Sequence, residues 1–303
     1  MPGRDGTPLR VHHYHAGGAA PSPLGLVVLA PGSRGGMGPG QLPATIGKFH
    51  PALRSTYTVL ARQLVAEGAA VCHLTWRTNP TRPGAKKGTL KAPQTLLDGA
   101  SDIADAACFL RAAHTGGGAL PLVLVGFSYG GPTVMAAAAM ALLPAADPYH
   151  VQALGRMAGV VTLGCGMRVR PEGDLVEVGR QLKGGASRAN AHEGYLGCDS
   201  QGCVEAFEAA GLPLCMVHGL QDVTVDPMAS AAIFELARGP KAAVWVRGGD
   251  HHMRSRLDEV VATLVDWARA LLRAGAVGRP AEAPLGLAGL GVARTLWPAL
   301  RVL

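Results

Sequence analysis

The chain has 303 residues, of which 48% are hydrophobic and 16% charged, and its formal net charge is +7. This apolar fraction suffices for a large buried core, which excludes an intrinsically disordered chain. The 42 glycines and 22 prolines follow no three-residue repeat, so a collagen-like chain is also excluded. The longest apolar run, roughly 134–143, is too short to cross a bilayer. We therefore expect a globular protein without a transmembrane segment.

Positive charge is concentrated in the first third of the chain. Residues 6–97 contain ten Lys or Arg and a single acid, Glu67. A solvated basic face is the simpler interpretation, and a field that attracts an anionic substrate or surface is the alternative. No nucleic-acid-binding motif accompanies the charge, so binding to DNA or RNA is not predicted. The absence of a signal-peptide pattern and of any CxxC pair favours a reducing, cytoplasmic setting.

Short apolar runs alternate along the chain with longer segments of helical periodicity. After a strand at 24–30, the pattern predicts a helix at 53–67, a strand at 69–75, a helix at 94–113, a strand at 120–126, a helix at 131–143, a strand at 158–163, a helix at 204–210, a strand at 214–218, a helix at 227–237, a strand at 242–246 and a helix at 254–272. Residues 9–15 are predicted to add an antiparallel edge strand. Buried strands separated by helices are typical of a parallel sheet covered on both faces, and hence of an α/β fold.

Two segments interrupt this alternation. Residues 166–202 are polar and rich in glycine, and we interpret them as a small, short polar lid within a single domain spanning 1–274. Residues 275–303 are predicted to form a C-terminal tail that is loosely docked or disordered. A partner-binding or surface-seeking role for this tail is the alternative.

A G-x-S-x-G pattern lies between a predicted strand and a predicted helix, where residues 126–130 read GFSYG. On such a tight turn the hydroxyl of Ser128 would project above the sheet, and the two glycines would avoid collisions with neighbouring backbone. The backbone N–H of Tyr129 would lie at the helix N-terminus, where it can stabilise an oxyanion. The context predicts Ser128 as a nucleophile, and a turn serine without a catalytic role is the alternative.

A serine hydroxyl needs a base, which is itself oriented by a carboxylate. Asp222 follows the predicted strand 214–218, and His251 follows the predicted strand 242–246. Ligands bind at the carboxyl ends of strands in open parallel sheets, so these two residues and the serine are expected to meet there. Asp226 is the alternative acid and His252 the alternative base.

The order Ser, Asp, His and its placement resemble the α/β-hydrolases over roughly residues 9–274, in the dienelactone-hydrolase-like branch of small hydrolases. The resemblance implies that Ser128 is the nucleophile, His251 the general base and acid, and Asp222 its orienting partner. Dienelactone hydrolases use cysteine as the nucleophile, whereas this chain has serine, which favours an ordinary serine acyl-hydrolase. The resemblance implies no metal and no organic cofactor.

Further residues are expected near the pocket. The resemblance implies a second oxyanion donor from the backbone after the strand 24–30, and either Ser33 or Arg34 could supply it, with Ser33 favoured. Trp76 and Arg77 follow the strand 69–75, so we expect them at the pocket rim as substrate-binding residues. Their loop carries five Lys or Arg residues and no acid up to residue 97, which favours an anionic substrate.

Histidine and cysteine spacings predict no metal site. His13 and His15 would share one face of the edge strand, but they have no carboxylate partner in the sequence pattern. Cys198 and Cys203 match no standard zinc spacing.

These observations predict a serine hydrolase that cleaves an ester or thioester with a small or medium acyl group. The alternative is a non-catalytic binding or scaffold protein that uses its basic N-terminal third or its C-terminal tail. A third hypothesis is that the tail directs peripheral contact with an anionic membrane surface.

Overall fold

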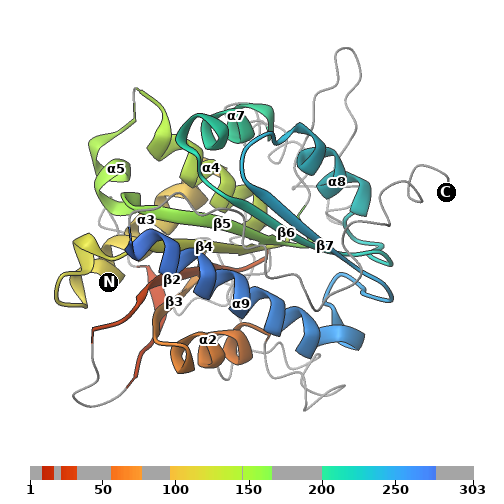
Figure 1. The fold of residues 1–303 in the computed structure, drawn as a ribbon, viewed down its shortest axis with the longest axis horizontal. Coiled ribbons are helices and arrows are strands. Elements are labelled where there is room, and N and C mark those ends of the chain that lie inside the picture. Colours follow the sequence, from red (N-terminus) through yellow and green to blue (C-terminus); the bar gives the residue numbers. More distant parts are fainter. Residues whose placement is uncertain are drawn as a thin grey trace, which may run out of the picture.

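The computed structural model describes residues 9–16, 22–32, 56–76, 96–144, 146–165 and 200–277. Within these ranges the centre of the protein is a seven-stranded sheet with the strand order β1-β3-β2-β4-β5-β6-β7 (Figure 1). The strands are β1 (Arg10–Tyr14), β2 (Gly25–Ala30), β3 (Ala69–Thr75), β4 (Leu122–Phe127), β5 (Met157–Leu163), β6 (Leu214–Gly219) and β7 (Lys241–Val246). The helices are α2 (Thr56–Ala66), α3 (Leu96–Ala112), α4 (Gly130–Leu142), α5 (Pro148–Leu154), α7 (Ser200–Ala210), α8 (Pro227–Leu236) and α9 (Leu257–Ala276).

The sheet is mostly parallel, as the alternation of strands and helices predicts. Strand β1 is the exception, because it pairs antiparallel with β3 in a register that sets His12 opposite His73. The predicted antiparallel edge strand is therefore confirmed. The strands β2 to β7 pair in parallel, so their carboxyl ends lie along one edge of the sheet.

Helices cover both faces of the sheet (Figure 1). Alternate residues of β2 point to opposite sides, so Leu26 and Val28 enter one apolar core and Val27 and Leu29 enter the other. The first core is completed by α3, α4, α5, α7 and α8, and the second by α2 and α9. Because the central strands are buried on both faces, they are continuously apolar rather than alternating.

The structure differs from the sequence-based expectation at one helix, at the predicted lid and at the predicted end of the domain. Helix α5 was not predicted, although its start carries a local signal: Asp147 caps it by accepting from the Tyr149 N–H, and Pro148 occupies the first turn. Residues 200–202 of the predicted lid belong to α7 instead, and residues 166–199 lie outside the described residues. Helix α9 continues to Ala276, past the predicted domain boundary at residue 274, and residues 278–303 of the predicted tail lie outside the described residues.

A buried arginine joins α3 to the segments beside it. The guanidinium of Arg111 donates to the carbonyls of Ala153 and Gly155 at the end of α5. It also donates to the carbonyls of Gly117, Gly118 and Leu120 around a short 3₁₀ turn. These carbonyls lie at the end of α5 and around the 3₁₀ turn, so one side chain hydrogen-bonds to two elements.

We expect Arg111→Met to lower the free energy of unfolding by about 3 kcal/mol, because it leaves several carbonyl oxygens without their donor. Chemical denaturation followed by circular dichroism measures this change. The control is Arg269→Met, which removes solvent-exposed ion pairs to Glu67 and Asp266 and should cost less than about 1 kcal/mol. Equal losses in the two variants would contradict this assignment.

Candidate active site

The turn between β4 and α4 has the strained geometry expected for an exposed nucleophile. Ser128 has a φ of 51°, in the left-handed region that non-glycine residues rarely adopt. Its N–H donates to the Leu163 carbonyl at 2.8 Å, which fixes the turn to the neighbouring strand. A Cβ atom at Gly126 would overlap the Gly130 carbonyl oxygen, and one at Gly130 would overlap the Ala30 carbonyl oxygen. Both glycines of the pattern are therefore required by close backbone approach.

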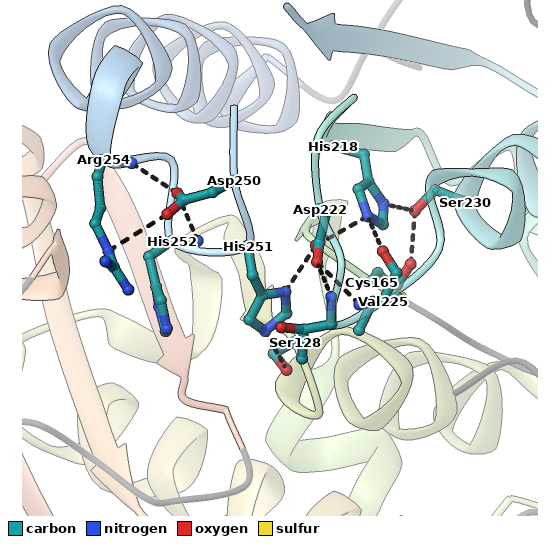
Figure 2. Close-up of polar contacts among 11 residues, drawn as sticks. Ser128, Cys165, His218, Asp222, Val225, Ser230, Asp250, His251, His252 and Arg254 are labelled. Atoms are coloured by element: carbon teal, nitrogen blue, oxygen red, sulfur yellow. Dashed lines mark hydrogen bonds and ion pairs between the residues drawn. The ribbon is translucent and has the colours of Figure 1, made fainter. Parts of the chain in front are cut away.

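Ser128, His251 and Asp222 form a continuous chain of hydrogen-bond contacts (Figure 2). His251 Nε2 lies 3.1 Å from Ser128 Oγ, and His251 Nδ1 lies 2.7 Å from Asp222 Oδ2. The serine lies 94 and 123 residues before its partners in sequence, and the fold brings all three to the carboxyl edge of the sheet. The arrangement allows the imidazole to take a proton from the serine while the carboxylate holds the opposite ring nitrogen.

Both oxygens of the Asp222 carboxylate have hydrogen-bond partners. Oδ1 accepts the backbone N–H groups of Thr224 and Val225 at 2.8 and 2.9 Å. Oδ2 faces His251 and a second histidine, His218, at 3.2 Å. Burial acts to raise the pKa of Asp222, but the hydrogen bonds from His218, His251 and the Val225 N–H outweigh it and hold the pKa well below its usual range. The carboxylate is therefore ionised at neutral pH.

The two alternative partners occupy other positions. Asp226 caps α8, and its carboxylate accepts the Met228 N–H at 2.9 Å. The backbone N–H of His252 donates to Asp250 at 3.1 Å, and its ring packs beside those of Phe127 and His251. Burial, followed by the charges of His251 and Arg254, lowers the pKa of His252. Of these candidates, Asp222 and His251 contact each other, and His251 also contacts Ser128.

The loop after β6 carries Asp222 and is called the acid loop here, and the loop after β7 carries His251 and is called the histidine loop. Their backbones are in close contact. A Cβ atom at Gly219 would overlap the Gly249 carbonyl oxygen, so glycine at this position lets the two loops touch. The Gln221 N–H donates to the Gly249 carbonyl at 2.9 Å. In the histidine loop, the Asp250 carboxylate accepts the N–H groups of His252 and Arg254. These contacts hold His251 within reach of Asp222.

The turn at the end of β2 lies against the serine. A Cβ atom at Gly32 would lie 3.3 Å from that of Ser128, and the Gly32 N–H donates to the Tyr57 hydroxyl at 3.2 Å. The predicted second oxyanion donor, Ser33, follows this turn but lies outside the described residues. Tyr129, the predicted first donor, occupies the N-cap position of α4 beside Ser128.

The position of Trp76 after β3 predicts a side chain at the rim of the pocket, but the structure places it inside the protein. Its side chain is buried, with a relative exposure of 1%, and its indole N–H donates to the Pro31 and Gly32 carbonyls at 3.1 Å each. Its role in substrate binding stays a prediction. Trp76 supports the turn beside Ser128. Arg77 and the basic loop that follows it lie outside the described residues.

The histidines near the edge strand form a cluster with a residue from the far end of α3. His13 Nε2 lies 3.1 Å from His114 Nε2, and the His13 and His15 rings lie 4.8 Å apart. Among the described residues, no group of three or more His, Cys, Asp or Glu side chains is placed to hold a metal ion. Cys198 lies outside the described ranges.

One histidine that is hydrogen-bonded to Asp222, His218, was not predicted from the sequence. This residue is the last but one of β6, four residues before Asp222, so its position near the end of the strand was the available signal. That signal is weak, because a histidine in a buried strand is typically a packing residue. The structure shows instead that its ring is fully buried and hydrogen-bonded to Asp222, Ser230 and Val225.

No known protein-family model matches the sequence, and no curated protein sequence matches it. Solved structures do match. Est1E from Butyrivibrio proteoclasticus aligns with a TM-score of 0.58 and 16% identity over 88% of this chain and 96% of that chain. XC6422 from Xanthomonas campestris, described as an α/β serine hydrolase without a lid, aligns with a TM-score of 0.51 and 15% identity over 87% and 89%. Dienelactone hydrolase from Anabaena variabilis aligns with a TM-score of 0.51 and 15% identity over 86% and 90%.

The chain therefore has the α/β-hydrolase fold, and the resemblance predicted from its motifs is confirmed at the level of the fold. No helix in the described part of the chain combines the length and apolarity needed to cross a membrane.

Proposed function

We propose that this protein is a serine hydrolase that cleaves an ester or thioester of a small or medium acyl group. The observation that carries the proposal is the unbroken contact from Ser128 Oγ through both ring nitrogens of His251 to Asp222. The serine hydrolase XC6422 and the dienelactone hydrolase among the similar structures support hydrolysis by an activated serine and of an ester. The presence of serine rather than cysteine at the turn favours an ordinary serine acyl-hydrolase.

In the proposed reaction Ser128 Oγ attacks the substrate carbonyl carbon while His251 Nε2 accepts the serine proton. Asp222 accepts the proton on His251 Nδ1 in a hydrogen bond, which selects the tautomer with Nε2 open and stabilises the imidazolium that forms. The imidazolium then protonates the leaving alcohol or thiol, which leaves an acyl group on Ser128. Water, deprotonated by the same imidazole, attacks this acyl-enzyme and releases the acid.

Backbone N–H groups are proposed to stabilise the tetrahedral oxyanion. Tyr129 contributes the donor at the N-terminus of α4, where the helix dipole favours negative charge. Ser33 contributes the second donor, and support comes from the turn before it, which Trp76 and Tyr57 hold beside Ser128. The basic residues between 77 and 97 favour substrates that bear a carboxylate or phosphate.

Labelling with a fluorophosphonate probe tests the proposed nucleophile. Such a probe forms a covalent bond only with an activated serine, so we expect wild-type protein to be labelled and Ser128→Ala to lose all labelling. A panel of nitrophenyl esters of increasing acyl length then defines the substrate class. A well-folded wild-type protein that takes no label would contradict the proposal and favour the scaffold hypothesis.

A further inference from the structure

His218 contacts Asp222 from the side away from His251 (Figure 2). Its Nε2 lies 3.2 Å from Asp222 Oδ2 and 3.0 Å from the Val225 carbonyl oxygen. Its Nδ1 lies 2.6 Å from Ser230 Oγ on α8. The ring is fully buried, so each of its nitrogen atoms must find its partner within the protein.

The hydroxyl of Ser230 determines the protonation of Nδ1. Ser230 Oγ lies 2.6 Å from the Cys165 carbonyl oxygen, which can only accept a hydrogen bond. The hydroxyl has a single proton and donates it to this carbonyl. Ser230 Oγ must therefore accept from His218, and Nδ1 carries a proton.

The partners of Nε2 lead to the same result for the other nitrogen. The Val225 carbonyl has no proton to offer. The Asp222 carboxylate already accepts two backbone N–H groups on Oδ1 and the His251 N–H on Oδ2. A lone pair on Nε2 would face two acceptors at hydrogen-bond distance, which is repulsive. Nε2 must therefore also carry a proton.

We propose that His218 is a doubly protonated positioning residue, which donates through Nδ1 to Ser230 and through Nε2 to Asp222. The Asp222 carboxylate then receives four donors, two on each oxygen, which leaves it one orientation toward His251. The charges of Asp222 and His218 compensate each other, which satisfies the requirement that a buried charge be paired and hydrogen-bonded. The assignment of a positioning role rests on the proposed function, whereas the charge state does not.

The lowered pKa of Asp222 agrees with this arrangement, because burial would raise it and the hydrogen bond from His218 is the foremost contribution that lowers it. Without the charged donor, Oδ2 would keep only His251 as a side-chain partner. The carboxylate would then be free to tilt about the loop, and the His251 ring would follow it away from Ser128.

Proton-detected NMR of protein with isotope-labelled histidine tests the charge state directly. The His218 ring is assigned from its backbone connectivity, so the assignment needs no variant. We expect directly bonded protons on both ring nitrogens of His218 at neutral pH in the full-length wild-type protein. A proton on only one of the two nitrogens would overturn the proposal, whatever the enzymatic activity proves to be.

Fluorophosphonate labelling kinetics test the positioning role, because probe affinity and the rate of bond formation are measured separately. His218→Gln can still donate to Asp222 but has no charge, and we expect the rate of bond formation to fall about ten-fold with little change in probe affinity. His218→Leu removes both donor and charge and should lower the rate about a hundred-fold. The matched control is His150→Gln, at a buried histidine on α5, which should leave the rate unchanged.

The outcomes separate this inference from the proposed function. Wild-type rates in both folded His218 variants would overturn the positioning role even if Ser128 is confirmed as the nucleophile. An unlabelled wild-type protein would contradict the proposed function instead, and the NMR measurement alone would then decide whether His218 is charged.

Discussion

Replacing His251 with glutamine should lower kcat for ester hydrolysis by about 10⁵-fold to 10⁶-fold. The ring is the sole group that contacts both Ser128 and Asp222 among the described residues, through atoms 3.1 and 2.7 Å from their partners. A glutamine amide cannot accept a proton at neutral pH, so Ser128 would lose its base. Steady-state hydrolysis of a nitrophenyl ester measures the loss, with circular dichroism as the test of folding.

The adjacent histidine is the matched control for this experiment. His252→Gln removes a ring of the same size one residue away, and it should change kcat by less than about ten-fold because the base itself remains. The ring of His252 packs beside Phe127 and His251. A greater loss in His252→Gln than in His251→Gln would reassign the base.

Asp222→Asn should lower kcat by about 10⁴-fold. The backbone N–H groups of Thr224 and Val225 require an acceptor at the Oδ1 position, so the asparagine carbonyl must occupy it. The amide NH₂ then replaces Oδ2 and points at His251 Nδ1. An amide donor at this place stabilises the tautomer with the proton on Nε2, which cannot accept the proton of Ser128.

The neighbouring acid is the control for this loss. Asp226 accepts the Met228 N–H as the cap of α8, and asparagine is an equally good capping residue. Asp226→Asn should therefore leave both kcat and thermal stability near the wild-type values. Loss of activity in Asp226→Asn with normal activity in Asp222→Asn would show that the acid is misassigned.

Site and fold depend on each other through a few close backbone approaches. The serine turn requires Gly126 and Gly130, and the contact between the acid and histidine loops requires Gly219. At each of these glycines, a Cβ atom would overlap a backbone carbonyl oxygen and push apart backbone close to Ser128, Asp222 or His251. The strained backbone conformation of the serine turn is held in place by the parallel sheet, whose strands are buried on both faces.

Much of the fold could be predicted from local patterns. Strands β2, β4 and β5 are continuously apolar because helices cover both faces of the sheet, and the helices between them keep a helical period. The antiparallel edge strand β1 was also predicted. Helix α5 was not, because only seven residues leave too short a periodic pattern.

Trp76 and His218 mark where local patterns are insufficient. Both lie at or just after the end of a strand, and nothing in the adjacent residues says whether such a side chain turns toward the site or into the core. Trp76 turns inward and holds the Pro31 carbonyl, whereas His218 turns toward Asp222. The direction depends on the packing of distant elements, which periodicity does not describe.

The α/β class, the order of the strands and of the helices other than α5, and the positions of Ser128, Asp222 and His251 after their strands could be predicted from the sequence alone. These features follow from periodicity and from the common edge at which parallel strands end. Only the tertiary structure decided which of two acids and which of two adjacent histidines contact each other, and that a second histidine joins them. Those choices depend on loop conformations that bring atoms to within 3 Å, and such distances are set by contacts between segments far apart in the chain.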